Sequence, residues 1–232
     1  MQVEICIETL EEAKLAAKYG CNRIEVCSAL DLGGLTPSIG LINSCLELNS
    51  IESHILIRPR AGNFVYSSSE IEIMKADIQI AAKAGAKGVV FACLNIDNEI
   101  DIIANNLLIQ TAGEHQLKIT FHRAIDFTKN YFKSFEIITE LGFDRVLTSG
   151  REVTAFEGLE NIKTLISKNN TSIEIMAGSG INAENVHLFR DIGLNAIHFS
   201  IRKQDFISNN VSMGNQFSPD ENKIKQIIQI IN

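Results

Sequence analysis

Two short runs of the sequence alternate apolar residues with reactive ones, namely VEICIE at 3–8 and RIEVC at 23–27. The reactive set comprises two thiols and three carboxylates: Cys6, Cys27, Glu4, Glu8 and Glu25. Such alternation is typical of a β-strand, whose successive side chains point to opposite faces. If the two runs are neighbouring strands, the thiols and carboxylates share one face. That face could hold a soft metal ion or exchange protons.

Two arginines flank a proline in the segment IRPRAGNFVYS. The residue before a proline favours an extended backbone, so Arg58 continues the strand that precedes Pro59. Guanidinium groups bind carboxylates and phosphates through paired hydrogen bonds. Arg58 and Arg60 are therefore candidates for binding an anionic substrate. The alternative is a structural ion pair of Arg58 with Glu8 or Glu25.

The segment TFHRAID ends an apolar run with a histidine, an arginine and an aspartate. Histidine changes charge near neutral pH and commonly acts as a general acid or base. We expect His122 to move a proton, with Asp126 or Glu25 orienting its ring. The alternative is a hydrogen-bonded histidine of the core.

A glycine turn, IMAGSGIN, and the segment HFSIR lie near the end of the chain. Exposed backbone N–H groups at such a turn can bind phosphate, especially after the last strands of an α/β barrel. The candidate ligand-binding residues here are Gly178, Gly180, His198 and Ser200, with Arg202 as a further partner. The alternative is a tight turn with a structural role only.

The thiols need separate treatment because soft sulfur ligands suit Cu(I). Cys6 and Cys27 would face the same interior, which makes them candidate copper ligands and copper a candidate cofactor. Against this, a buried cysteine often serves only as a small apolar residue. The sequence has neither a C-x-x-C pair nor an H-E-x-x-H motif, so we do not expect a structural zinc site.

The elements that would position these residues repeat in a regular order. Eight β-branched runs alternate with stretches of helical spacing. The runs lie at 3–8, 23–27, 54–59, 88–93, 117–122, 145–149, 173–176 and 195–200. The helical stretches include Leu10–Tyr19, Glu70–Ala84, Tyr131–Leu141, Ala183–Ile192 and Asn222–Ile231. The repeat predicts one (β/α)8 TIM-type barrel domain over residues 1–232. A doubly wound sheet is the alternative, but it would be expected to carry a G-x-G-x-x-G loop.

The alternating strands predict a barrel with a polar interior. Buried charges must be paired, so we expect an internal ion-pair network. Its expected members are Glu4, Glu25, Glu174, Lys118, Arg58 and Arg145. Active sites of such barrels form at the carboxyl ends of the strands. This location selects Glu8, Cys27, Arg58, Arg60, His122 and His198.

Composition limits the class of partner. The net charge of −7 argues against nucleic acid, which requires a basic surface. The N-terminus lacks the pattern of a signal peptide, and no run approaches the roughly 20 apolar residues of a membrane span. Five cysteines, an odd number in a long chain, indicate free thiols in a reducing compartment. We therefore expect a cytoplasmic protein that binds neither nucleic acid nor membranes and forms a homo-oligomer, a dimer or a tetramer.

Several blocks of the sequence also resemble one known family. RIEVCSALDLGGLTPSIG, ILIRPRAGNFVYSSSEIEIMKADI, GVVFACLNIDNEID, ITFHRAIDF, RVLTSG and IEIMAGSGI are similar, in order and spacing, to blocks of the CutC copper homeostasis family. The resemblance runs from near residue 1 to about residue 215. It implies a cytosolic (β/α)8-type barrel, usually oligomeric, that binds copper.

The resemblance also implies roles for particular residues. The copper thiols of the family fall on Cys6 and Cys27, and its polar cluster falls on Glu8, Glu25, Arg58, His122 and Asp126. The chain departs from the family pattern at Asn63, where an acidic residue is common, in the loop Ala177–Gly180, and at Asp97–Asn98, where an aspartate–glycine turn is usual.

Two functions follow as hypotheses. The first is copper homeostasis with Cu(I) bound by Cys6 and Cys27. The second is an enzyme acting on a small anionic or phosphorylated metabolite, with Arg58 and Arg60 binding charge and His122 moving a proton. A purely partner-binding role would leave the polar barrel mouth unexplained.

Overall fold

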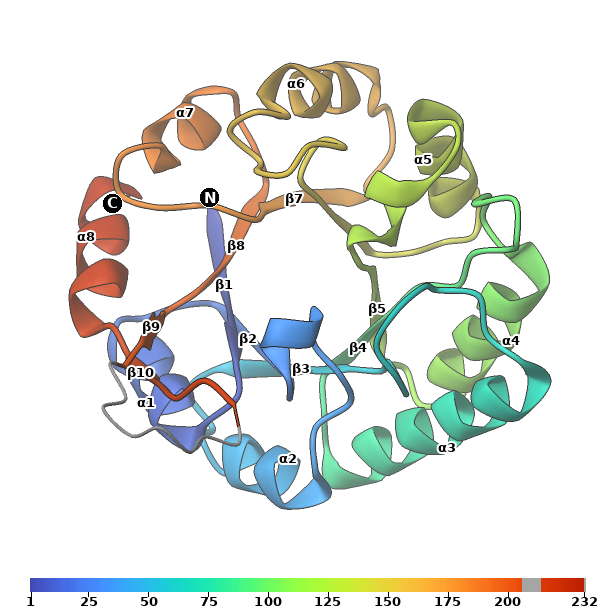
Figure 1. The fold of residues 1–232 in the computed structure, drawn as a ribbon, viewed down its shortest axis with the longest axis horizontal. Coiled ribbons are helices and arrows are strands. Elements are labelled where there is room, and N and C mark those ends of the chain that lie inside the picture. The colour runs from blue at the N-terminus through green and yellow to red at the C-terminus, as the bar shows by residue number, and fades with distance from the viewer. Residues whose placement is uncertain (206–213, 232) are drawn as a thin grey trace.

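Eight parallel strands form a closed barrel, with a helix after each strand (Figure 1). The computed structural model describes residues 1–205 and 214–231. Neighbouring strands follow chain order, and the last strand pairs with the first to close the ring. The strands are β1 (Gln2–Ile7), β2 (Arg23–Val26), β3 (Glu52–Leu56), β4 (Gly88–Phe91), β5 (Lys118–Phe121), β6 (Arg145–Thr148), β7 (Glu174–Gly178) and β8 (Ala196–Ser200). The predicted (β/α)8 barrel is confirmed.

Helices surround the barrel as an outer ring (Figure 1). They are α1 (Leu10–Lys18), α2 (Ile39–Leu46), α3 (Ser68–Ala84), α4 (Ile102–Gly113), α5 (Tyr131–Glu140), α6 (Leu159–Lys168), α7 (Val186–Asp191) and α8 (Glu221–Ile231). Two short 3-10 helices, η1 (Leu30–Leu32) and η2 (Arg123–Phe127), lie in the loops after β2 and β5. None of the helices within residues 1–205 and 214–231 is long and apolar enough to cross a membrane.

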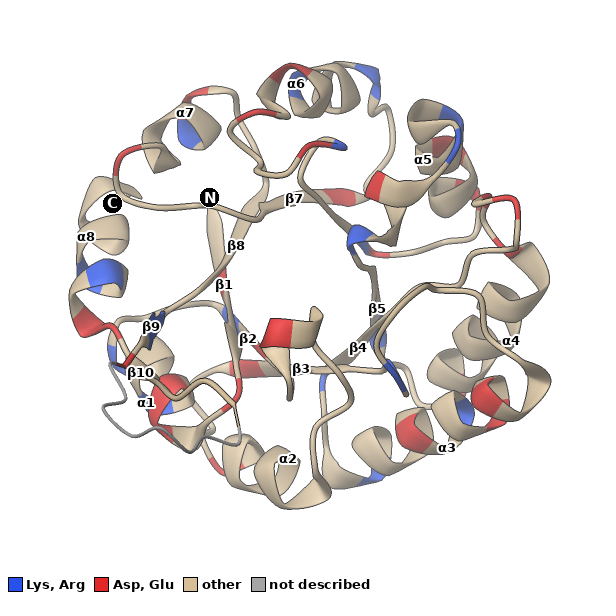
Figure 2. Cartoon of the chain, in the orientation of Figure 1, with Lys and Arg blue, Asp and Glu red and all other residues tan. Residues whose placement is uncertain are grey.

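The alternation of the strands separates the buried side chains into two compartments. Val3, Ile5 and Ile7 belong to a large apolar core between the strands and the helices. The interior of the barrel holds smaller apolar groups, one of which is Cys6, Cys27, Leu56 and Val90, and another Leu147, Met176 and Ala196. Charged residues also lie on the strands themselves, as Figure 2 shows. The predicted polar interior follows directly from this alternation.

Local sequence signals explain where the helices begin and end. Thr9 and Ser67 cap α1 and α3, each through a reciprocal capping box with a glutamate three residues later. Gly85 ends α3 with φ of 102°, a left-handed conformation that favours glycine. The helix expected at Ala183–Ile192 is shorter, because α7 begins only at Val186.

The polar segment at 203–222 contains structure that its sequence did not predict. A hairpin joins β9 (Arg202–Gln204) to β10 (Phe217–Pro219). Each of these strands has three residues, which is too short for a hydrophobic period to be visible. The hairpin lies directly after β8 and so adjoins the carboxyl ends of the barrel strands.

Candidate functional site

The amino-terminal half of the barrel interior holds a network of paired charges. Arg23 donates to Glu4 at 2.8 Å and to Glu174 at 3.1 Å, and Arg145 donates to Glu174 at 2.8 Å. Gln2 is a further acceptor for Arg23. Both arginines are buried, so each guanidinium compensates a carboxylate that has little access to water.

The barrel interior contains an ion-pair network, as expected, but two of the expected members, Lys118 and Arg58, do not belong to it. Lys118 has a 63% exposed side chain and pairs with Asp144 at 2.8 Å outside the barrel interior. Arg58 binds loop carbonyls instead of carboxylates. Their place is taken by Arg23, which sequence reasoning missed although it shares the strand face of Glu25 and Cys27.

His198 joins this network to the carboxyl end of the barrel. Its Nδ1 lies 2.8 Å from Oε1 of Glu4, and its Nε2 lies 3.6 Å from Oε2 of Glu25. Burial by itself would lower the pKa of His198, but contact with Cys6 and with the carboxylates of Glu4 and Glu25 raises it well above its usual value. We therefore assign His198 as an imidazolium at neutral pH.

The two carboxylates beside His198 behave differently. Burial would raise the pKa of Glu4, but its hydrogen bond to His198 and the charges of His198 and Arg23 hold that pKa well below the usual range. Burial raises the pKa of Glu25 to about 7, and the charge of Glu4 adds to this effect. Glu4 is thus a fixed negative charge, whereas Glu25 can gain or lose a proton near neutral pH.

The two candidate copper thiols face the barrel interior. They lie in one buried cluster with Leu56 and Val90. Sγ of Cys27 lies 3.5 Å from Oε2 of Glu25, and burial together with that carboxylate raises the pKa of Cys27 well above its usual value. No group of three or more His, Cys, Asp or Glu side chains in the described part of the chain is arranged to hold a metal ion.

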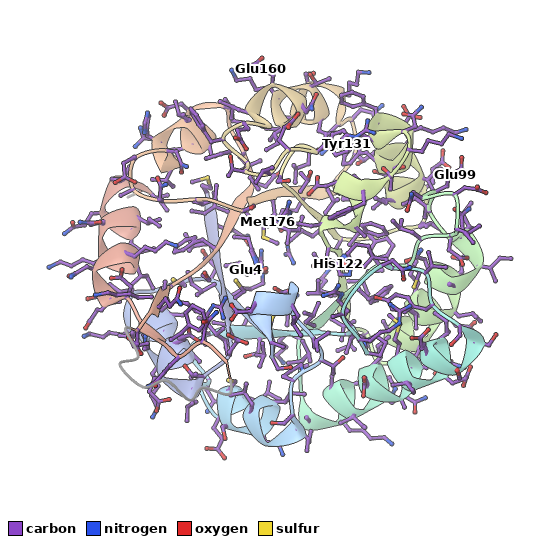
Figure 3. All side chains as sticks on the ribbon, viewed as in Figure 1. Glu4, Glu99, His122, Tyr131, Glu160 and Met176 are labelled. Atoms are coloured by element: carbon purple, nitrogen blue, oxygen red, sulfur yellow. The ribbon has the colours of Figure 1, made fainter. Side chains whose placement is uncertain are left out.

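His122 lies at the end of β5 with one ring nitrogen unsatisfied. Its Nδ1 accepts a hydrogen bond from the backbone N–H of Ala124 at 3.1 Å, so the ring proton belongs on Nε2. That Nε2 is buried and has no hydrogen-bond partner in the described residues. Burial lowers the pKa of His122 to about 3, and the charge of Arg58 adds to this effect. His122 is therefore a neutral hydrogen-bond donor facing the interior, toward the centre of the view in Figure 3.

Asp126 does not orient His122 in this arrangement. It accepts hydrogen bonds from Thr148 at 2.5 Å, from the backbone and hydroxyl of Ser149, and from Arg123 at 3.0 Å. Asp126 therefore joins η2 to the loop after β6. The expected partner Glu25 lines the same cavity as His122 but makes no described hydrogen bond to it.

The two candidate anion-binding arginines lie in different places. Arg58 donates from Nη1 to the carbonyls of Leu32 and Gly34 and from Nη2 to that of Gly62, and its side chain lines a cavity. Arg60 binds Glu70 and loop carbonyls such as that of Val65. It is not among the described residues that line the cavities at this end of the barrel. Arg123 lines the cavity where Arg60 was expected to contribute.

Glu8 and Ser200 lie at the rim of the barrel. Glu8 accepts from Arg202 at 2.5 Å and from the backbone N–H of Leu30 at 2.7 Å. Arg202, the first residue of β9, also binds Asp31 at 2.9 Å, so it joins η1 to the residue that follows β1. Lys223 of α8 donates to the carbonyl of Ser200 at 2.6 Å. These contacts fix the rim and leave Glu8 committed to an ion pair.

The glycine turn after β7 packs closely against its neighbours. A Cβ at Gly178 would lie 2.8 Å from Leu147 and 3.3 Å from His198. Gly180 has φ of 73°, and a Cβ there would meet Thr154 at 3.0 Å. The turn therefore requires glycine for packing at both positions.

Two neighbouring cavities with shared lining residues lie at the carboxyl end of the barrel. The inner cavity, of about 120 Å³, is lined by Glu25, His122, His198, Leu30, Leu56 and Leu147. The outer cavity, of about 480 Å³, is lined by Leu32, Phe127, Leu94, Asn63, Asn98 and Gly62. Both are lined by Arg58, Arg123, Phe64 and Gly33. The structure thus gathers Glu25, Arg58, His122 and His198 around one space, with Cys6 and Cys27 beside it.

This space combines a proton-exchanging carboxyl, a neutral N–H donor and positive charge. Such a set can bind a small anion and transfer a proton to or from it. Glu25 and His198 lie within β2 and β8, whereas Arg58 and His122 lie just after β3 and β5.

Comparisons with known proteins identify the family. The model of the CutC family matches residues 1–203. The chain is 42% identical over 205 residues to a CutC family protein of Glaesserella parasuis, covering 88% of this chain and 84% of that protein. It is 40% identical over 220 residues to one of Aliivibrio fischeri, covering 92% of this chain and 89% of that protein.

Solved structures agree with the sequence comparisons. A CutC protein of Streptococcus agalactiae, which is named for copper homeostasis, has a TM-score of 0.80 at 33% identity and covers 86% of this chain and 98% of its own. A 3-hexulose-6-phosphate synthase of Salmonella typhimurium has a TM-score of 0.65 at 13% identity, covering 100% of this chain and 98% of its own, and shares the fold alone. The chain therefore belongs to the CutC family.

Proposed function

We propose that the barrel mouth is the active site of an enzyme that transfers a proton to or from a small anionic metabolite. One observation carries this proposal: the carboxyl of Glu25, with a pKa raised to about 7, lines a cavity together with two histidines. The pKa of one of them, His122, is lowered, and that of the other, His198, is raised. A general acid or base works best when its pKa lies near the working pH. Glu4 differs from Glu25 because it lies 2.8 Å from both Arg23 and His198, which hold its pKa low, whereas Glu25 lies 3.6 Å from His198.

Each residue of the site has a distinct role in this proposal. Arg58 and Arg123 attract the negative charge of the substrate. His122 donates its Nε2 hydrogen to an oxygen that gains charge during proton transfer, and it remains neutral because its pKa is about 3. Glu25 exchanges the proton, and His198, held by Glu4 at 2.8 Å, supports its charged form.

A hydrogen-exchange experiment tests the proposal. Wild-type protein in D₂O is incubated with small carboxylates and phosphate esters that carry a C–H next to a carbonyl, and the loss of that proton signal is followed by NMR. We expect exchange with wild type and none above background with Glu25→Gln. Glu160→Gln, with an 83% exposed side chain on α6, is the matched control and should exchange as wild type does. Equal exchange in Glu25→Gln and wild type would refute the role of Glu25.

A second function, Cu(I) binding by Cys6 and Cys27, is supported by the position of the thiols. Cys6 pairs in register with Glu25, and Cys27 lies two residues further along the chain, directly after β2. Strand spacing and rise place such diagonal Cα atoms about 8 Å apart. This exceeds the roughly 7 Å limit for a disulfide. Two thiols on one inner face can instead bind one soft ion between them.

An anaerobic Cu(I) titration against a competing chelator tests this second function. We expect about one ion per chain, lost in both Cys6→Ser and Cys27→Ser and retained in Cys45→Ser, which changes a buried thiol of the outer core. Affinity should rise with pH, because the raised pKa of Cys27 requires the metal to displace a proton. Binding that is unaffected by either substitution would exclude this thiol pair.

A further inference from the structure

Resting on the proposed function, the geometry points to a substrate class: a small carboxylate whose anionic head enters the inner cavity and whose flat apolar body lies in the outer cavity against Phe127 and Leu32. The two cavities differ in size and lining, and two apolar side chains are exposed at the wall of the outer one.

The size of the inner cavity limits what can enter it. Its volume of about 120 Å³ is a quarter of that of the outer cavity, about 480 Å³. This accommodates a carboxylate and the carbon beside it, with His122 Nε2 available as a donor to one oxygen. A longer ligand would extend past Arg58 and Arg123, which line both cavities, into the outer one.

The outer cavity has the character of a site for an apolar body. Its volume of about 480 Å³ falls within the range of small-molecule sites, about 300–1,000 Å³. Four large apolar side chains line it: Leu32, Phe64, Leu94 and Phe127. Its polar lining comes from the two shared arginines and two asparagines, Asn63 and Asn98. A ligand body here would meet aromatic surface on one side and positive charge toward the inner cavity.

Two of these apolar side chains are exposed to water. Phe127 is 61% exposed and Leu32 is 57% exposed. Covering them with a flat apolar group would remove apolar area from water, which favours binding. Phe127 contacts Phe64 edge to face at 5.6 Å, and Phe64 packs on His122 at 4.9 Å. A continuous row of rings thus leads from the surface to the proposed proton donor.

The wall of the outer cavity is held in place by the fold itself. Leu32 belongs to η1, and its backbone carbonyl accepts a hydrogen bond from Arg58 at 2.9 Å. Phe127 ends η2, and the next residue, Thr128, hydrogen-bonds back to the carbonyl of Ile125 at 2.8 Å. A preformed wall costs little ordering entropy when a ligand binds.

Calorimetric titration with three matched probes tests this inference. The probes are 3-phenylpropanoate, propanoate, which lacks the ring, and 3-phenylpropanamide, which lacks the charge. We expect 3-phenylpropanoate to bind at least about tenfold more tightly than either of the others. Phe127→Ala should remove most of the gain from the ring and leave propanoate affinity unchanged. Phe127→Leu, which keeps an apolar wall, should retain part of the gain.

The matched control is Phe156→Ala. Phe156 is 53% exposed, close to the exposure of Phe127, but does not line either cavity within the described residues. This variant should bind all three probes as wild type does. Equal affinities of 3-phenylpropanoate and propanoate, or equal losses in the two alanine variants, would overturn the substrate class.

Histidine-selective ¹⁵N NMR separates this inference from the proposed function. Binding of a carboxylate head should shift the Nε2 signal of His122 whether or not the probe has a ring. If propanoate shifts that signal and the ring adds nothing to affinity, the substrate class fails and the proposed function stands. If neither acid shifts it, the substrate class fails, and the proposed function is decided by the hydrogen-exchange experiment with phosphate esters.

Discussion

The two ends of the barrel are both polar, but they use their charges differently. At the amino-terminal end, Arg23 and Arg145 are paired with Glu4 and Glu174. At the mouth, His122 keeps an unpartnered N–H and Glu25 has a pKa raised to about 7. The amino-terminal end also has a cavity of about 780 Å³, larger than either cavity at the mouth.

This comparison shows that cavity size does not identify the site of this barrel. The amino-terminal cavity is lined by basic residues, Arg23, Arg145 and Lys118, and by acidic ones, Glu52, Glu174 and Asp144, so its charges compensate one another. Compensated charge stabilises a fold but leaves little capacity to bind or transfer a charge. The mouth holds groups whose partners are missing or whose protonation can change, which are properties of functional sites.

The largest expected effect tests the amino-terminal end. Arg23→Met should lower the free energy of unfolding by about 3–5 kcal/mol, because buried Glu4 loses its guanidinium partner and Glu174 loses one of its two arginines. Urea unfolding measures this change. Arg190→Met, which breaks an exposed pair with Asp191 on the surface, should have little effect. A loss in Arg23→Met no larger than in the control would mean that the network is not structural.

The next effect concerns the mouth and has the opposite sign. The folded pKa of Glu25, about 7, lies above its unfolded value of 4.5, so the folded state binds the extra proton between these pH values. Wild-type stability therefore falls as pH rises from 4.5 through 7. Glu25→Gln removes this loss, and it should be more stable relative to wild type at pH 8 than at pH 5, on the order of 2 kcal/mol.

Urea unfolding at both pH values measures this difference. The same substitution should abolish the proton exchange proposed above, so that activity and stability change in opposite directions. If Glu25→Gln shows the same stability difference from wild type at pH 5 and pH 8, Glu25 does not titrate in this range.

A further prediction concerns the protonation state of His122 at the mouth. The folded pKa of His122, about 3, lies below the usual 6.5, so His122 should stay neutral with its proton on Nε2 from pH 5 to pH 8. The unfolded chain gains this proton near pH 6.5, so His122 costs stability as pH falls from 6.5 toward 3. Histidine-selective ¹⁵N NMR checks the tautomer, with the chain unfolded in urea as the titrating reference. A His122 signal that titrates near pH 6.5 in the folded chain would contradict its burial.

The smallest expected effect concerns the contacts of Glu8 with η1 and Arg202 at the rim of the barrel. Glu8→Ala should remove both the acceptor for the Leu30 amide and the ion pair with Arg202, and speed hydrogen exchange at that amide about fivefold. Glu8→Gln keeps an acceptor oxygen and should have a smaller effect. Unchanged exchange in both variants would show that η1 is held without Glu8.

The sequence could predict which residues face the barrel interior because that depends only on parity along each strand. Cys6, Glu25 and His198 are buried inside, as the alternation required. The partner of each interior charge could not be predicted in this way. Arg58 binds carbonyls of loops whose course depends on the left-handed residues Gly33 and Gly34.

Long-range partners were also hidden from the sequence. The sequence suggested that Asp126 would pair with His122, because the two are close in the chain. Its carboxylate instead accepts hydrogen bonds from Ser149, in the loop after β6. Lys118 begins its strand and therefore reaches solvent at the barrel base rather than the interior. The partner of each side chain depends on the register between strands and on the shape of the loops. The alternation of residues along a strand contains no information on either.

The division of buried side chains between an outer and an inner compartment has an evolutionary consequence. The packing that holds β1 to the helices uses Val3, Ile5 and Ile7, and none of these three residues lines either mouth cavity. Substitutions at inward positions can therefore alter the chemistry of the mouth without disturbing the layer that keeps the helices in place. A lineage of such barrels can exchange one reaction for another through a few inward residues while its descendants remain recognisable by their outward ones.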